Sequence, residues 1–104
     1  MGKYLLAVPS AANAGRDDEY NQWYGADHLN DVLAIPGVVS GKRFKAEPTS
    51  PNAPPQPELA SYELELDDPS TFFTEMGRRA QTGEMKISPA LDTSSAQLWL
   101  FKAQ

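Results

Sequence analysis

The sequence contains no cysteine and only one histidine, His28. The absence of cysteine excludes disulfide bonds, thiolate nucleophiles and zinc sites built from thiolates. A metal site would therefore need carboxylates, and the best set of possible ligands, Asp27, His28 and Asp31, is small and weakly specific. We expect no bound metal ion.

Positive charge is also scarce, with 9 lysine and arginine residues against 14 aspartate and glutamate residues and a net charge of -5. Such a chain repels phosphate backbones and anionic membrane surfaces unless its cations cluster. The densest group, Lys42, Arg43 and Lys45, does not form one patch, because only alternate residues of a strand share a face. We expect neither a nucleic-acid partner nor a membrane partner.

Long apolar runs are missing as well. No stretch approaches the roughly 20 residues that span a bilayer, and the apolar segment from Tyr4 to Val8 is too short for a secretory signal. We therefore expect a soluble, cytoplasmic protein. The length of 104 residues predicts a single domain, residues 1–104, with one modest core.

Apolar periodicity predicts four strands. Residues 59–66 show the clearest pattern, because apolar and polar residues alternate there without exception after Leu59. The first strand is short and nearly all apolar, and we expect Pro9 to end it. The predicted strands cover residues 3–8, 38–45, 59–66 and 96–102.

Two helices and one long loop separate these strands. The first helix is predicted from about Asp18 to Ala34, and Ile35-Pro36-Gly37 ends it, because proline disfavours helical angles in the preceding residue and glycine permits a reversal. The second begins at Pro69, after a capping carboxylate, and ends near Gly83. Residues 47–58 carry five of the nine prolines and are predicted to form a surface loop.

The predicted order is β-α-β-β-α-β, and right-handed crossovers turn this order into a ferredoxin-like plait. This α+β fold has a four-stranded antiparallel sheet with both helices on one face. The first and last strands are apolar on both sides of their alternation, so the other face also needs a cover. A second copy of the chain would supply it, and we expect a homodimer.

The segment from Trp23 to Phe44 reads W-Y-x-x-x-H-L-x-D-V-L-x-I-P-G-V-V-S-G-x-R-F. This motif resembles the EthD-like family of the dimeric α+β barrel superfamily, over about a quarter of the chain. The resemblance implies a homodimer in which two sheets pack into a barrel, with a small-molecule cleft in each protomer between the helices and the sheet. Relatives of this type act on aromatic, polyketide or lactone-like intermediates without a metal or organic cofactor, so it also implies that none is needed here.

His28 and Tyr24 are the candidate catalytic residues. An imidazole with an ordinary pKa of about 6.5 can accept and return a proton near neutral pH. Tyr24 lies one helical turn before His28 and could donate its phenol to a substrate oxygen or to the imidazole. Asp31, three residues further on, could orient the ring. The alternative is that all three are packed or surface side chains without a chemical role.

Five further residues are candidates for substrate binding. Tyr20 and Trp23 precede His28 on the same helix and could form an aromatic wall. Arg43 could clamp a carboxylate or stabilise an enolate, or it could form an ordinary ion pair. Tyr62 and Trp99 lie on strands and could reach the floor of the cleft, the core or the dimer interface.

Three functions remain open at this point. The first is a cofactor-independent isomerase, cyclase, lyase or monooxygenase in which His28 moves a proton of a small aromatic, polyketide or lactone-like metabolite. The second is a non-catalytic dimer that binds a hydrophobic metabolite or assists another enzyme of its pathway. The third and weakest is haem binding through His28 and Trp23, which a colourless protein without a Soret band would exclude.

Overall fold

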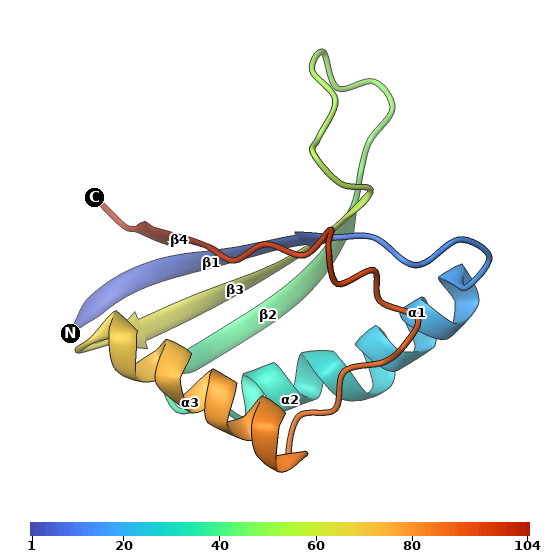
Figure 1. Ribbon diagram of the computed structural model, residues 1–104. Helices are drawn as coiled ribbons and strands as arrows, with labels where there is room; N and C mark the ends of the chain where they lie inside the picture. The colour runs from blue at the N-terminus through green and yellow to red at the C-terminus, as the bar shows by residue number, and fades with distance from the viewer.

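The computed structural model describes residues 1–104 and contains one antiparallel sheet and two helical segments (Figure 1). The first helical segment is continuous, but its middle turn is a π-helix, and the strand order in the sheet is β2-β3-β1-β4. The elements are β1 (Gly2–Ser10), α1 (Asp17–Trp23), η1 (Tyr24–His28), α2 (Leu29–Leu33), β2 (Val38–Lys45), β3 (Glu58–Leu66), α3 (Pro69–Thr82) and β4 (Trp99–Lys102). The predicted ferredoxin-like plait is therefore confirmed.

Both helical segments cover the same face of the sheet, and the other face has no cover (Figure 1). The alternation predicted for β3 holds, since Tyr62 and Leu64 are buried towards the helices while Glu63 between them is exposed. Tyr62 pairs with Leu6 of β1, and both side chains are fully buried. The core thus lies between the sheet and the helices, where Tyr20, Val32, Ile35 and Phe72 complete it.

Strand β1 is longer than the sequence predicted, because Pro9 does not end it and pairing with β3 continues to Ser10. The carbonyl oxygen of Pro9 accepts a hydrogen bond from the backbone N–H of Gln97, on the β4 side of the strand. The N–H that proline lacks would face the same side, beyond the last β1–β4 pair, Ala7 with Trp99. No ladder hydrogen bond is lost, so proline is tolerated there.

Strand β4 is shorter than predicted and begins at Trp99 instead of Ala96. The preceding residues follow the end of β1 without regular pairing and run beside the helices. Segment Met85–Leu98, which joins α3 to β4, contains no helix and only one isolated bridge, between Ala12 and Leu91. An apolar pattern alone does not distinguish a strand from a buried irregular segment.

The proline-rich residues 46–57 form a loop between β2 and β3, as predicted. A hydrogen bond from the Ala46 N–H to the Pro57 carbonyl oxygen closes its base at 2.8 Å. The loop extends away from the helices, past the uncovered face of the sheet (Figure 1). No helix of the chain combines the length and the apolar character needed to cross a membrane.

Gly37 ends the first helical segment with φ at 98°, as the Ile35-Pro36-Gly37 stop predicted. A Cβ atom at this position would lie 2.4 Å from Cδ2 of Leu66 and 3.1 Å from the carbonyl oxygen of Glu65. Glycine is therefore required at position 37 for two reasons, the positive φ angle and the close approach of β3.

We expect Gly37→Val to lower the free energy of unfolding by more than about 1 kcal/mol, because it combines a strained backbone with a clash in the core. Urea denaturation measures the change. Gly15→Val is the matched control, since Gly15 also has a positive φ, 78°, but no atom within 4 Å of an added Cβ. Equal losses in the two variants would show that contact with Leu66 contributes nothing.

Candidate functional site

A cleft of about 570 Å³ opens on the helix side of the sheet. It lies between η1, α3, the end of β1 and segment Met85–Leu98, and its size is typical of sites for small organic ligands. Its walls are mostly apolar, and its polar groups are few. The lining residues are Val8, Ser10, Trp23, Tyr24, His28, Phe73, Met76, Gly77, Ala80, Met85, Ile87, Leu91, Ala96, Gln97 and Leu98.

The π-helical turn places His28 against Trp23. In η1 the Leu29 N–H donates to the carbonyl oxygen of Tyr24, five residues earlier, instead of four as in an α-helix. Residues five apart on an α-helix point about 140° away from one another. Here the rings of Trp23 and His28 instead stack at 4.5 Å between centroids with an interplanar angle of 24°.

Tyr24 contacts the same imidazole from another direction. Its ring meets His28 edge-on, with 4.8 Å between centroids and an angle of 90°. Tyr20 packs against Tyr24 in turn, with centroids 5.6 Å apart. The aromatic side chains of this helix therefore form one cluster around His28, in which Trp23 and Tyr24 line the cleft and Tyr20 packs behind them.

Burial keeps the imidazole neutral. Desolvation lowers the pKa of His28 from 6.5 to about 4, and no nearby carboxylate raises it again. The Nδ1 atom is buried and has no hydrogen-bond partner. At neutral pH the ring is thus an uncharged base whose tautomer no protein group fixes.

Asp31 does not orient the imidazole, although its position three residues after His28 allowed that role. It makes no hydrogen bond with the ring, whose Nδ1 atom has no partner. Burial and the nearby charge of Asp27 raise the pKa of Asp31 instead. His28 therefore lacks the carboxylate that commonly stabilises an imidazolium in acid–base catalysis.

The phenols of Tyr24 and Tyr62 form a pair beside the cleft, with their hydroxyl oxygens 3.3 Å apart. Tyr24 lines the cleft, while Tyr62 lies beneath it on β3. Burial raises the pKa of Tyr24, and it raises that of Tyr62 to about 12, so both phenols keep their protons at neutral pH. Either oxygen can be the donor, so when Tyr62 donates to Tyr24, the Tyr24 hydroxyl can offer its own hydrogen to a ligand.

A second hydroxyl pair joins β1 to α1. Ser10, which lines the cleft, and Tyr20, which lies behind it, have hydroxyl oxygens 2.6 Å apart. Burial is the main cause that raises the pKa of Tyr20. Tyr20 is thus a supporting residue for Ser10, whose importance nothing in the sequence indicated.

Arg43 lies outside the cleft, behind the aromatic cluster. Its guanidinium carbon is 4.9 Å from the centroid of Tyr24, and its Nη2 atom donates to Oδ1 of Asn21 at 2.7 Å. It also forms an ion pair with Glu58 at 3.5 Å. Arg43 thus forms the ion pair that was the alternative to carboxylate binding, and its side chain does not line the cleft.

Trp99 is directed to the uncovered face of the sheet. It pairs with Ala7 in β4 and is 38% exposed, and its ring is not part of the lining. Its indole N–H donates to Oε1 of Gln97 at 2.8 Å. Trp99 can therefore influence the cleft only through Gln97, which does line it.

Most of the lining was not predicted from the sequence, since only Trp23, Tyr24 and His28 were candidate site residues. The spacing of Phe73, Met76 and Ala80 on α3 indicated an apolar helix face, but not that this face borders a cleft. The wall formed by Met85, Ile87 and other residues before β4 lies in an irregular segment, which has no periodicity to detect.

Comparison with solved structures finds the same fold in proteins of very different sequence. A protein from Shewanella loihica PV-4 that is proposed to be a monooxygenase aligns with a TM-score of 0.67 at 12% identity, covering 99% of this chain and 95% of the other. An ethyl tert-butyl ether D (EthD) family protein from Bacillus halodurans C-125 aligns with a TM-score of 0.63 at 16% identity, covering 100% of both chains.

No family model and no curated protein matches the sequence. The structural comparisons nevertheless confirm the ferredoxin-like α+β fold, and one of the two neighbours is described as a member of the EthD family that the Trp23–Phe44 motif resembles. At such low identity they establish the fold alone. The chemistry has to be argued from the cleft.

The free energy of unfolding should decrease in acid, because folding holds His28 in its neutral form. Because the pKa of His28 falls from 6.5 to about 4 on folding, the unfolded chain binds more protons between these values. The stability that depends on the neutral ring is complete above pH 6.5 and is lost as the pH falls towards 4. We expect wild type to lose up to roughly 3 kcal/mol more than His28→Leu over this range, measured by urea denaturation. Parallel curves for the two proteins would contradict the assignment.

Proposed function

We propose that the chain is a cofactor-independent enzyme that binds a small, mostly apolar metabolite in the cleft, with His28 as a general base. The observation that carries this proposal is the neutral imidazole of His28 in the wall of an apolar cleft. A base accepts a proton only in its unprotonated form, and burial keeps His28 in that form throughout the neutral range. The same burial makes the ring a weaker base, so the substrate needs a hydrogen-bond donor, such as Tyr24, at the oxygen that gains charge.

The reaction step that fits these groups is removal of a proton from a carbon next to a carbonyl group. The imidazole takes the proton, the C–H electron pair forms the C=C bond of an enolate, and the carbonyl oxygen gains the negative charge. A phenol of the Tyr24–Tyr62 pair can donate a hydrogen bond to that oxygen. The imidazolium then returns its proton to carbon, so the step is balanced without another reactant.

This step is common to several reaction types. Isomerases, cyclases and lyases that act on aromatic, polyketide or lactone-like compounds can all begin with an enolate, and so can a monooxygenase that passes the electrons to oxygen. The proposed monooxygenase from Shewanella and the EthD family protein share the fold and are compatible with such chemistry. They do not select one reaction among these.

A non-catalytic binding protein is the second candidate. The observation that favours it is the buried Nδ1 atom of His28, which has no partner to stabilise a positive ring. In this case His28 would only contribute a polar contact to a bound metabolite. The two candidates differ in whether a proton moves.

Deuterium exchange separates these two candidates without knowledge of the natural substrate. We expect the protein to accelerate exchange of the α-hydrogens of 2-tetralone, a neutral aromatic ketone, in D₂O, as followed by NMR. His28→Gln should lower the protein-catalysed rate by about 10²- to 10⁴-fold, the usual contribution of a positioned base. The rate should fall as the pH drops through about 4, the pKa of the buried ring.

Two variants serve as controls for this experiment. Tyr24→Phe keeps the ring and removes only the hydroxyl, so it should slow exchange without displacing His28. Gly77→Leu should close the cleft, because a Cβ at Gly77 meets no atom within 4 Å and Gly77 lines the cleft. A wild-type protein that binds 2-tetralone without accelerating exchange would favour the binding protein, and unchanged acceleration in His28→Gln would show that His28 is not the base.

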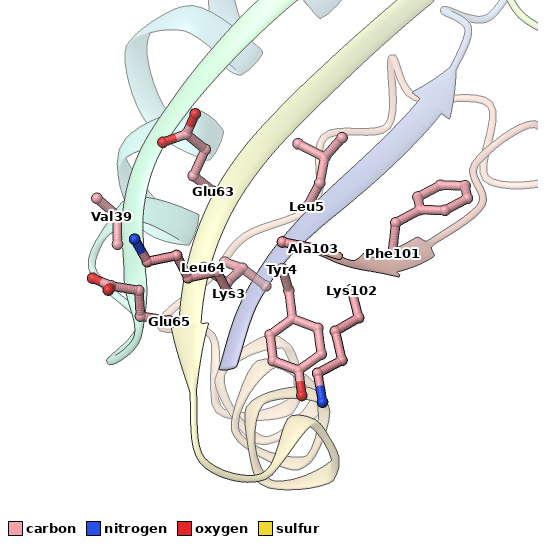
Figure 2. A pocket seen from close by; sticks show the side chains of 10 residues that line it. All are labelled: Lys3, Tyr4, Leu5, Val39, Glu63, Leu64, Glu65, Phe101, Lys102 and Ala103. Carbon is pink, nitrogen blue, oxygen red and sulfur yellow. The ribbon is translucent and has the colours of Figure 1, made fainter. Parts of the chain in front are cut away.

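We also propose that the uncovered face of the sheet forms a homodimer. This face exposes five large apolar side chains, among them Phe101 and Val39, each 56% exposed. A shallow hollow of about 450 Å³ lies beside Leu5 and Phe101, with Lys3, Glu63 and Glu65 near its edge (Figure 2). The five residues are Leu5, Val39, Phe44, Trp99 and Phe101.

A second copy is the simplest cover for this face, since an apolar patch of this kind is uncommon on a monomer. Charges of both signs border the apolar residues of this face, since Lys3 pairs with Glu65 across the β1–β3 ladder and Lys42 lies on β2 next to Phe44, so two copies can meet with opposite charges near one another. The resemblance of the Trp23–Phe44 motif to dimeric relatives points to the same face.

We expect sedimentation equilibrium to give twice the 11.4 kDa mass of one chain. Phe101→Glu should shift the protein towards monomer, because it places a charge in the proposed interface. Thr74→Glu adds the same charge on the exposed side of α3 and should leave the dimer intact. A wild-type protein that stays monomeric at micromolar concentration would contradict the proposal.

A further inference from the structure

The cleft contains no charged side chain. None of its 15 lining residues is a lysine, arginine, aspartate or glutamate. Its polar groups are Ser10, Tyr24, His28 and Gln97. His28 is uncharged at neutral pH, because burial lowers its pKa to about 4, and burial also keeps Tyr24 protonated.

Neighbouring cations do not place a charge in the lining. The guanidinium of Arg43 lies over the ring of Tyr24 and is engaged by Asn21 and Glu58. Arg79 is paired with Glu75, and Lys86, between two lining residues, is exposed to solvent. The chain as a whole carries a net charge of -5, which disfavours the approach of an anion. A carboxylate or phosphate in the cleft would lose its water and find no opposite charge.

The polar groups of the cleft do suit a hydroxyl. Each of the pairs Ser10–Tyr20 and Tyr24–Tyr62 shares one hydrogen bond, which leaves a hydrogen and lone pairs for a ligand. A neutral imidazole also offers one donor and one acceptor. A hydroxyl group both donates and accepts, so it can be satisfied by any of these groups, whatever the tautomer of His28.

We propose, building on the cleft assigned above as the functional site, that its ligands are uncharged compounds with an apolar ring system and a hydroxyl or enol group. The cleft selects against the corresponding carboxylates. This specificity could not be read from the motif, which allowed Arg43 to bind a carboxylate. In the structure Arg43 instead packs on Tyr24 and pairs with Glu58, so it does not line the cleft.

Four naphthalene derivatives test the proposal, with dissociation constants measured by isothermal titration calorimetry at neutral pH. We expect 2-naphthol to bind most tightly, and naphthalene to bind roughly 5- to 10-fold more weakly, because it lacks one hydrogen bond. The anion 2-naphthoate should bind at least about 100-fold more weakly than 2-naphthol, because its charge is buried without a partner. Methyl 2-naphthoate has nearly the same shape as this anion but no charge, and it should bind at least tenfold more tightly than the anion.

A charge introduced at the rim provides the complementary test. Leu98 lines the cleft and is 50% exposed, so a lysine there can reach the ligand and still contact water. We expect Leu98→Lys to raise the affinity for 2-naphthoate relative to that for 2-naphthol at least tenfold, whatever both ligands lose with the leucine side chain.

The possible outcomes separate this inference from the proposed function. If 2-naphthoate binds wild type as tightly as 2-naphthol, and Gly77→Leu abolishes both, the cleft is the site but the neutral specificity is wrong. If none of the four compounds binds, or if Gly77→Leu leaves their binding unchanged, the cleft itself is not the binding site and both proposals fail. The expected order of affinities, with 2-naphthol tightest and 2-naphthoate weakest, together with loss of binding in Gly77→Leu, supports both the cleft as the site and its neutral specificity.

Discussion

The stacking of His28 on Trp23 is the contact on which the candidate site depends, and a single irregular turn of helix produces it. In a regular α-helix the two side chains would diverge, and the imidazole would move away from the apolar wall that lowers its pKa. The hydrogen bond from Leu29 to Tyr24 prevents this by adding one residue to the turn. Such π turns are often found at functional sites, since they reposition a side chain without breaking the helix.

The site and the hydrophobic core share the same residues. Tyr20, Tyr24 and Tyr62 are almost completely buried and belong to the main core cluster, yet their hydroxyl groups border the cleft or support a residue that does. Their rings stabilise the fold, while the Tyr24 hydroxyl belongs to a lining residue and the hydroxyls of Tyr20 and Tyr62 hydrogen-bond to lining residues. Removing a hydroxyl while keeping the ring therefore tests function separately from stability, whereas removing the whole side chain would change both.

The sequence predicted the fold better than it predicted the site. Alternation in β3, the Pro-Gly stop before β2 and the capped start of α3 are local patterns, and each matches the structure. The site brings together segments that are distant in the sequence. Only the part of the lining on α1 and η1 could be predicted, from the spacing of Trp23, Tyr24 and His28. The segment before β4 that forms one wall of the cleft has no apolar periodicity, and the apolar pattern of the first helix does not show that one of its turns is a π-helix. Arg43 and Trp99 could be placed on strands, but their surroundings depend on strand register and on how the helices pack.

The proposed ligand cleft and the proposed dimer interface lie on opposite faces of the sheet. Every lining residue of the cleft belongs to the helices, the end of β1 or the segment before β4, whereas the exposed apolar residues of the sheet lie on the opposite face. The two surfaces are connected most directly by Trp99, which is exposed on one face and donates a hydrogen bond to Gln97 at the other. A partner that covered Trp99 would hold Gln97 in place without entering the cleft. Association would then affect the geometry at the rim of the cleft, while the burial that keeps His28 neutral comes from side chains of a single chain.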